Sequence, residues 1–223
     1  MEFIDDYRLL AVLRETQSEP LSLALINTEG GAEVTHMKTI FFLPPFIDSY
    51  QFIDLLLECG AHEPSPAESL APFHQDPSQR IVVLDLGNAP YYLVLRAEAL
   101  LAFENRAGPN IRWDAWKGCV VMPLIPDNLM FSDVWVSGCR LFFLCQQDSS
   151  SHTHMEMYDF SLQGRARCLS GSVHEEFSGL RYLLPTGTRV PIPLDGRLGS
   201  CSSGHGSLVF RTVSVIALCF IRE

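Results

Sequence analysis

Short apolar runs, each bounded by turn-forming residues, recur along the chain and restrict it to a mainly β fold. Runs of about four to eight apolar residues between Gly, Pro, Asn or Ser clusters are typical of strands, and about a dozen strands are expected here. The first three runs follow one another through short links, which predicts an antiparallel meander. The expected strands cover Arg8 to Arg14, Leu21 to Ile26, Thr35 to Leu43, Arg80 to Leu86, Tyr91 to Leu95, Cys119 to Leu124, Phe131 to Val136, Cys139 to Cys145, Thr153 to Phe160, Leu180 to Leu184, Ser207 to Arg211 and Val213 to Ile221.

One segment alone has a convincing helical composition. Arg96 to Arg106 is rich in Ala, Glu and Leu, contains no β-branched residue and is followed by Gly108-Pro109, a typical helix stop. Tyr50 to Cys59 fits a strand or a short helix. Five Gly and three Pro lie between Pro185 and Gly206, so little regular structure is expected there.

Three strand ends share a format, in which an apolar pair precedes Asn27, Asp85 or Asp159 and a turn. Weak repetition of a strand-and-turn unit is typical of propeller blades, although the separations of 58 and 74 residues are uneven. We therefore expect antiparallel meanders that form a partial β-propeller-like domain with one short helix; the alternative is a β-sandwich. Residues 1–223 are interpreted as a single domain, with the 60–79 loop as the best candidate for a weak boundary.

The composition favours a folded, acidic, intracellular protein. Hydrophobic residues make up 47% of the chain, enough for a packed core, and 26 acidic residues against 16 basic ones give a net charge of −10. That charge repels nucleic-acid phosphate and anionic membranes, so neither is expected as a partner. The N-terminus has no signal-peptide pattern, and the longest apolar run is far below the roughly 20 residues of a membrane helix. A cytoplasmic or nuclear location is expected.

The sequence offers no metal or cofactor motif. Seven cysteines stand at irregular spacing without a Cys-x-x-Cys, which indicates free thiols, buried in apolar surroundings at Cys119, Cys139, Cys145 and Cys219. His152 and His154 would share one face of a strand and could bind a metal there. However, Ser149 to Thr153 is interpreted as a solvated loop, so no metal is assigned.

No catalytic residue is assigned either, and the chain is not expected to be an enzyme. Phosphate-binding loops and a Gly-x-Ser-x-Gly elbow are absent from the sequence. Cys201 to Ser207 places nucleophile types beside His205, but a triad also needs an orienting carboxylate. The adjacent acids Asp5-Asp6 and Glu175-Glu176 would point apart on a strand or helix.

Trp113-Asp114-Ala115-Trp116 allows two interpretations. The two indoles could anchor a partner, because Trp is enriched in interface hot spots. They could equally fasten a loop to the outside of the domain, and we favour this structural role.

Several stretches carry a family resemblance. They are Leu23 to Thr28 (LALINT), Leu70 to Leu84 (LAPFHQDPSQRIVVL), Trp113 to Trp116, Asp133 to Phe142 (DVWVSGCRLF), Met155 to Ala166 (MEMYDFSLQGRA), Leu180 to Gly187 (LRYLLPTG) and Gly204 to Phe210 (GHGSLVF). Together they resemble the C-terminal region of the F-box-type proteins that mushroom-forming fungi carry in large sets.

The resemblance implies a β-propeller-like region that follows an F-box and selects proteins for ubiquitination, while the F-box docks a Skp-type adaptor of a cullin ligase. No catalytic residue belongs to that region. No three-helix F-box segment precedes Arg8 here, so a Skp-type adaptor is expected only if an F-box is encoded upstream. The expected function is a non-enzymatic protein-interaction module with an unknown protein partner. The alternatives are a hydrolase-like enzyme, in which His174 or His205 meets a carboxylate and a nucleophile, and a non-functional family fragment.

Overall fold

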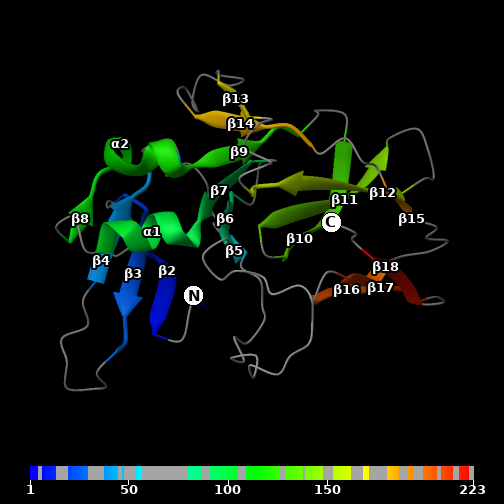
Figure 1. The fold of residues 1–223 in the computed structure, drawn as a ribbon, viewed down its shortest axis with the longest axis horizontal. Coiled ribbons are helices and arrows are strands. Elements are labelled where there is room, and N and C mark those ends of the chain that lie inside the picture. The colour runs from blue at the N-terminus through cyan, green and yellow to red at the C-terminus, as the bar shows by residue number, and fades with distance from the viewer. Residues whose placement is uncertain are drawn as a thin grey trace.

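In the computed structural model, the described part of the chain forms four β-sheets, two α-helices and a 3₁₀ turn (Figure 1). We name the sheets A to D. The described residues are 1–4, 7–13, 20–29, 38–44, 47, 54–56, 80–86, 91–104, 109–125, 129–137, 139–147, 153–161, 168–170, 180–185, 190–192, 198–204, 207–212 and 216–220.

Sheet A is the N-terminal meander. Its first four strands pair antiparallel in chain order, and β8 then joins β4 in parallel. The register of β2 and β3 runs from Arg8 opposite Asn27 to Leu13 opposite Ser22. The predicted meander is thus confirmed. The strands are β1 (Glu2–Phe3), β2 (Arg8–Leu13), β3 (Ser22–Asn27), β4 (Lys38–Phe42) and β8 (Asn110–Ile111).

Sheet B is mixed, in the order β13-β14-β9-β7-β6-β5. β5, β6, β7 and β9 pair antiparallel, and β14 returns from later in the chain to lie parallel to β9. Of the ambiguous segment 50–59, the described residues form a strand. The strands are β5 (Asp54–Leu56), β6 (Ile81–Asp85), β7 (Tyr92–Arg96), β9 (Val121–Pro123), β13 (Cys168–Ser170) and β14 (Arg181–Leu183).

Sheets C and D are antiparallel and come from the second half of the chain. Sheet C has the order β10-β11-β12-β15, and sheet D has the order β16-β17-β18, with β16 next to β10. The strands of sheet C are β10 (Leu129–Ser137), β11 (Arg140–Gln147), β12 (Thr153–Asp159) and β15 (Val190–Ile192). Those of sheet D are β16 (Leu198–Gly204), β17 (Ser207–Thr212) and β18 (Ile216–Phe220).

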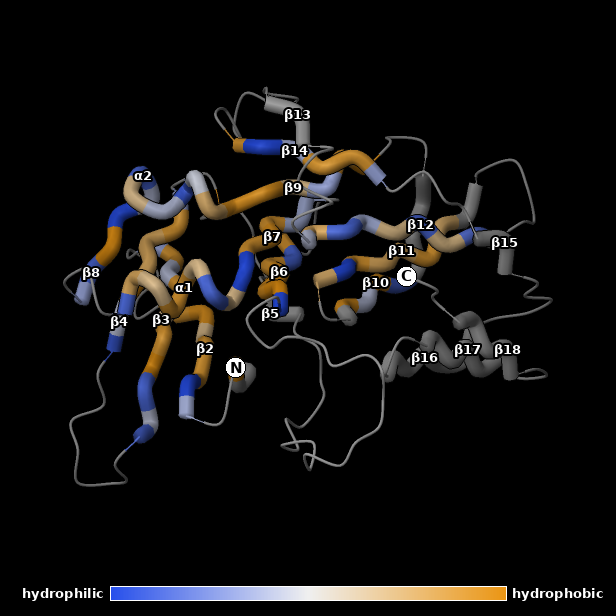
Figure 2. The backbone as a smooth tube through the Cα atoms, in the orientation of Figure 1, coloured by the Kyte–Doolittle hydropathy of each residue, from blue (hydrophilic) through white to orange (hydrophobic). Residues whose placement is uncertain are grey.

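The central strands of sheet B, β6 and β7, are buried on both faces. Successive side chains on a strand point to opposite faces, and those of β6 and β7 enter two separate cores. In Figure 2, these central strands are drawn hydrophobic between sheets A and C. The core shared with sheet A contains Leu10, Leu23, Leu25, Phe41, Val82, Leu84, Leu93 and Leu95. The core shared with sheet C contains Ile81, Val83, Tyr92, Val94, Leu141, Phe143, Cys145 and Tyr158.

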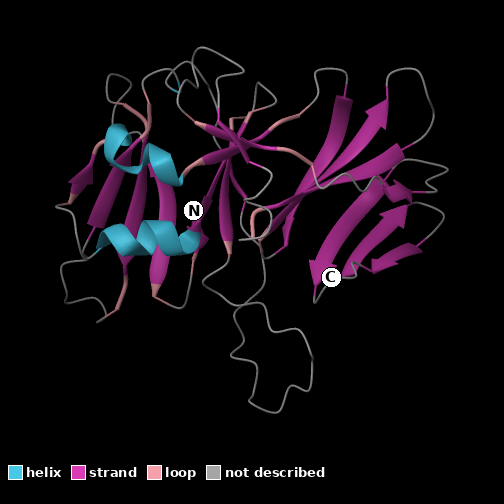
Figure 3. Cartoon of the chain, turned by 45° about the horizontal axis from the view of Figure 1, so that its top comes forward, coloured by secondary structure: helices cyan, strands magenta, loops and turns pink. Residues whose placement is uncertain are grey.

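The helices α1 (Ala97–Glu104) and α2 (Trp113–Trp116) lie over sheet A (Figure 3). Both contribute to its core, through Leu100 of α1 and Trp116 of α2. α1 follows β7 directly, and the first N–H of the helix, from Ala97, donates to Arg80 O over 2.9 Å. The helix predicted at 96–106 is confirmed. Among the described residues, neither helix is long and apolar enough to cross a membrane.

Three expectations need correction. The segment from Pro185 to Gly206 contains β15 and the seven-residue strand β16, despite its Gly and Pro content. A second short helix, α2, stands beside the one predicted. Cys119 lies in the 3₁₀ turn Lys117–Cys119 before β9 and is not part of a strand. The mainly β class and the antiparallel pairing of consecutive strands are confirmed, while the whole 60–79 loop lies outside the described residues.

Candidate functional site

His154 lies in strand β12, within the strand expected from Thr153 to Phe160, and of the expected loop from Ser149 to Thr153 the described residue Thr153 belongs to the same strand. The His154 side chain is 12% exposed, and Nε2 stands 3.6 Å from Oε1 of Glu156, itself only 3% exposed. Glu156 pairs with Phe143, so this pair faces the core between sheets B and C. The strand spacing of two was the signal for Glu156, which the sequence interpretation overlooked. His152 lies outside the described residues, and no group of three potential metal ligands occurs among those described.

The other catalytic candidates are not brought together in the described part of the chain. Asp5, Asp6, His174, Glu175, Glu176 and His205 lie outside it. Cys201 and Ser207 lie on the hairpin of β16 and β17, where Ser207 pairs with Gly204 and Cys201 with Phe210. The prediction of no catalytic residue therefore stays a prediction.

Three free cysteines have described side chains. Cys145 is buried, as expected, whereas Cys119 and Cys139 are only half-buried. The Cys139 thiol lies 3.8 Å from Asp159 Oδ1. Burial first, and then the negative charge of Asp159, raise the pKa of the Cys139 thiol above its ordinary value. Cys139 is therefore a thiol held in its neutral form.

The two tryptophans of α2 fasten this helix to sheet A. Trp116 is 1% exposed, and its Nε1 donates to the carbonyl oxygen of Phe42 over 3.1 Å. Its ring meets Phe41 edge to face at 5.5 Å, and Trp113 packs against Trp116 at 4.9 Å. The predicted structural role is confirmed for Trp116, since an indole buried with its N–H satisfied is committed to the fold.

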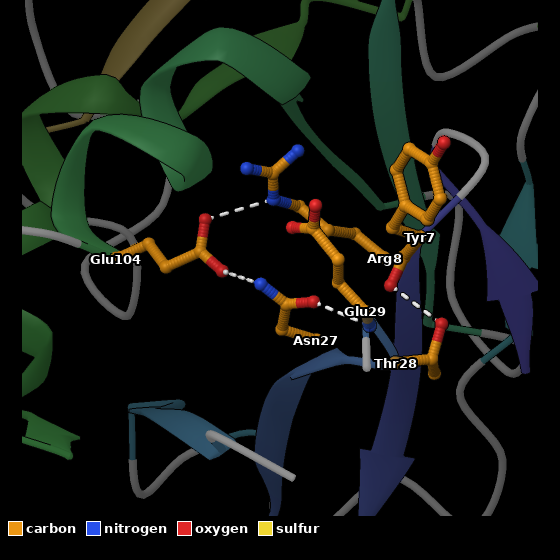
Figure 4. A network of polar contacts seen from close by, with 6 residues as sticks. All are labelled: Tyr7, Arg8, Asn27, Thr28, Glu29 and Glu104. Carbon is orange, nitrogen blue, oxygen red and sulfur yellow. Dashed lines mark hydrogen bonds and ion pairs between the residues drawn. The ribbon is translucent and has the colours of Figure 1, made fainter. Parts of the chain in front are cut away.

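A polar network ties α1 to the end of the β2–β3 hairpin (Figure 4). Glu104, 8% exposed, accepts hydrogen bonds from Arg8 Nε at 2.8 Å and from Asn27 Nδ2 at 3.3 Å. Asn27 Oδ1 in turn accepts the Glu29 N–H at 2.8 Å. Both donors to the Glu104 carboxylate in Figure 4 belong to sheet A. The network therefore holds helix α1 against this sheet.

The strand-end format noticed in the sequence has a local cause. Asn27 accepts a hydrogen bond from the N–H two residues later, and Asp159 does the same with Ser161 N–H at 2.8 Å. Such turns, in which an Asn or Asp side chain replaces a backbone acceptor, are common where strands end. The recurring Asn and Asp are therefore turn residues at these two places.

A small cavity lies at the junction of sheets B and C, and two arginines are among the residues that line it. Its volume is about 20 Å³, and it is partly open to solvent. Arg96, Arg181 and Cys119 line it together with apolar side chains of both sheets. A water molecule needs roughly 10–15 Å³ in this measure, so the cavity holds one or two waters or a group of that size.

The two arginines of the cavity are held differently. Arg96 is 11% exposed; its Nη2 donates to Phe160 O at 3.4 Å, while Nη1 lies 3.9 Å from the exposed Glu98 carboxylate. Its Nε is buried and has no hydrogen-bond partner. Arg181 donates from Nη2 to Gly118 O at 2.9 Å. Sequence reasoning missed both, although Arg96 shares a strand face with Tyr92 and Val94, where a charge is unexpected.

Comparison with known proteins does not identify a family. No family model matches the chain, and no curated protein and no solved structure matches it significantly. The function must therefore be argued from the residues and their arrangement.

Proposed function

We propose that this chain is a non-enzymatic protein-interaction module on a partial β-propeller-like scaffold, similar to the β region of fungal F-box-type proteins. The observation that carries the proposal is the burial of β6 and β7, the central strands of sheet B, on both faces. Their alternate side chains pack against sheet A on one face and sheet C on the other. Propeller blades are antiparallel meanders packed face to face, and β1 to β4, β5 to β7 and β10 to β12 are three such meanders in chain order.

Three buried or part-buried polar groups also support a binding scaffold, because their hydrogen bonds join separate elements. Trp116 joins α2 to β4, Glu104 joins α1 to β2 and β3, and the Tyr158 hydroxyl of β12 donates to Leu124 O at 3.0 Å. Each bond links segments far apart in the sequence. Rigid scaffolds of this kind commonly present their loops for recognition.

The interaction proposal is tested by quantitative affinity purification of the tagged full chain from its native cells. The comparison is between wild type, Phe143→Ala and Phe143→Leu. Phe143 is buried between sheets B and C, so the Ala variant disrupts the stacking and the Leu variant largely retains it. We expect a protein that co-purifies with wild type and Phe143→Leu, is lost from Phe143→Ala, and binds saturably once purified. Retention by all three chains, or specific turnover by the purified protein that one side-chain change removes, would overturn the proposal.

The narrower ligase proposal has its own test. The native transcript is sequenced upstream of the Met1 codon, and the longest in-frame product is assayed for binding of a purified Skp-type adaptor. We expect an in-frame F-box segment, adaptor binding that depends on it, and a longer half-life of the partner when the gene is deleted. A stop codon close upstream would remove the ligase mechanism and leave the interaction module standing.

A further inference from the structure

The cavity between sheets B and C combines positive charge with an apolar wall. Both strands that carry its arginines, β7 and β14, belong to sheet B, while Phe160 closes the cavity from the end of β12 in sheet C. The remaining lining residues are Ile81, Val94, Leu95, Cys119, Val121 and Leu183. The Arg96 side chain is 11% exposed, so its guanidinium is poorly solvated and attracts an anion more strongly than one in water.

The positive charge in the cavity is incompletely neutralised. The described carboxylate within ion-pair distance of Arg96 is that of Glu98, which is 62% exposed and 3.9 Å away. Arg181 bonds the neutral carbonyl of Gly118 and, in the described part of the chain, forms no ion pair. In addition, the buried Nε of Arg96 has no acceptor. Buried donors are normally paired, and a bound group that accepts a hydrogen bond would satisfy this one.

Size and shape restrict the ligand. A space of about 20 Å³ excludes nucleotides and sugars but admits a single planar carboxylate. Guanidinium groups match the two oxygens of a carboxylate in geometry as well as charge. The apolar lining of Ile81, Val94 and Leu183 suits a short hydrocarbon stem attached to that carboxylate.

We propose that Arg96 and Arg181 form a binding site for a carboxylate group at the junction of sheets B and C. The carboxylate bridges β7 and β14 next to Phe160 of sheet C, and so fastens the two sheets to each other. The site is independent of the protein-interaction proposal. A carboxylate can come from a free small acid or from the end of a peptide, and the two sources differ in what must enter the cavity.

Thermal unfolding of the full chain in acetate tests the site. A ligand that binds only the folded state raises its stability with the logarithm of its concentration. We expect the Tm to rise by about 3–5 °C at ten times the acetate dissociation constant, relative to chloride at equal ionic strength. N-acetylglycine, which imitates a peptide end, is the second arm. If both acids raise the Tm, the site also accepts the C-terminal carboxylate of a peptide. If acetate alone raises the Tm, the site accepts small free acids.

Cys119 supplies a local readout, because this half-buried cysteine is one of the residues that line the cavity. We expect acetate at ten times its dissociation constant to slow alkylation of Cys119, followed by mass spectrometry of its peptide, by about tenfold. Cys139 lies outside the cavity lining and serves as the internal control.

The variants separate binding from folding. Arg181→Gln should abolish both acetate effects, and it removes one exposed bond to Gly118 O. Arg96→Gln is the second variant, but it also loses the bond to Phe160 O, so its own Tm without acetate is compared as well. Arg112→Gln is the matched control, because Arg112 is exposed and lies outside the cavity. Equal shifts in acetate and chloride, or an acetate shift unchanged in Arg181→Gln, would mean that the cavity holds water only and would overturn the proposal.

Discussion

The rings of Tyr92 in sheet B and Phe143 in sheet C meet edge to face, with their centroids 5.0 Å apart. Phe143 makes a second edge-to-face contact with Tyr158 at 5.4 Å. Phe143→Ala should therefore lower the free energy of unfolding by about 3–5 kcal/mol, since it leaves a cavity between two sheets. Denaturant titration measures this. Tyr7→Ala, at an exposed aromatic residue, is the control and should change stability by less than about 0.5 kcal/mol.

The bond between Trp116 and Phe42 can be separated from the packing of the indole ring. Trp116→Phe retains an aromatic ring but leaves the carbonyl of Phe42 without its donor, at a cost of about 1–3 kcal/mol. Trp116→Ala also loses the contact with Phe41 and should cost about 3–5 kcal/mol. Trp113→Phe, in which no such bond is removed, provides the comparison. Equal stability of the two Phe variants would contradict a role for the Trp116 hydrogen bond.

The Glu104 network predicts coupling between residues far apart in the chain. Glu104→Gln keeps the shape of the side chain but removes the charge that faces Arg8, and it should lower stability by about 1–3 kcal/mol. A double-mutant cycle with Arg8→Met isolates the interaction, and we expect a coupling energy of about 0.5–3 kcal/mol. Additive effects of the two changes would show that the contact contributes nothing to stability.

Cys139 should react slowly with alkylating agents at pH 7 to 8. Burial and the Asp159 charge raise the pKa of its thiol, so less of the reactive thiolate is present. Asp159→Asn removes the charge and retains an acceptor for the Ser161 N–H, so alkylation of Cys139 should accelerate. Peptide mass spectrometry follows the rate, and Asp114→Asn, at an exposed aspartate, should leave it unchanged.

Asp133 should make the stability of the folded chain depend on pH, and the direction of its pKa shift fixes the sign of that dependence. Asp133 is an exposed residue, but desolvation of its carboxyl raises the pKa of this group in the folded state above the ordinary 3.8. The folded chain therefore binds this proton more tightly than the unfolded chain, and stability from this group falls as the pH rises from 3.8 through the folded pKa. Asp133→Asn should raise the Tm slightly at pH 7 and not at pH 3. A larger benefit at pH 3 would contradict the sign.

The local pattern of apolar and polar residues in the sequence was sufficient to predict most of the strands and helix α1. β2, β6 and β11 are continuous apolar runs with polar or turn residues at their ends, and the helix-forming composition after Arg96 identified α1. The pattern failed at β16, whose sequence LGSCSSG has low strand propensity and is held by pairing with β17. Strand propensity is weak where a neighbouring strand decides the conformation.

The cavity could not be predicted in the same way. Arg96 and Arg181 line the same cavity because β14 lies beside β9, a parallel pairing between segments distant in the sequence. Nothing in the local sequence of either arginine indicates its neighbour. For His154 and Glu156, by contrast, the expected strand from Thr153 to Phe160 already placed both side chains on one face, so their proximity could have been predicted.

The central position of sheet B has a consequence for how this protein can diverge. All four residues of β6 from Ile81 to Leu84 are buried, and they alternate between two different cores. A surface strand can accept drift on its outer face, but β6 has no such face. Each accepted change in it requires a compensating change in sheet A or in sheet C, whichever core that residue enters. Homologous chains should therefore retain this strand almost unaltered while the sheets on either side of it vary.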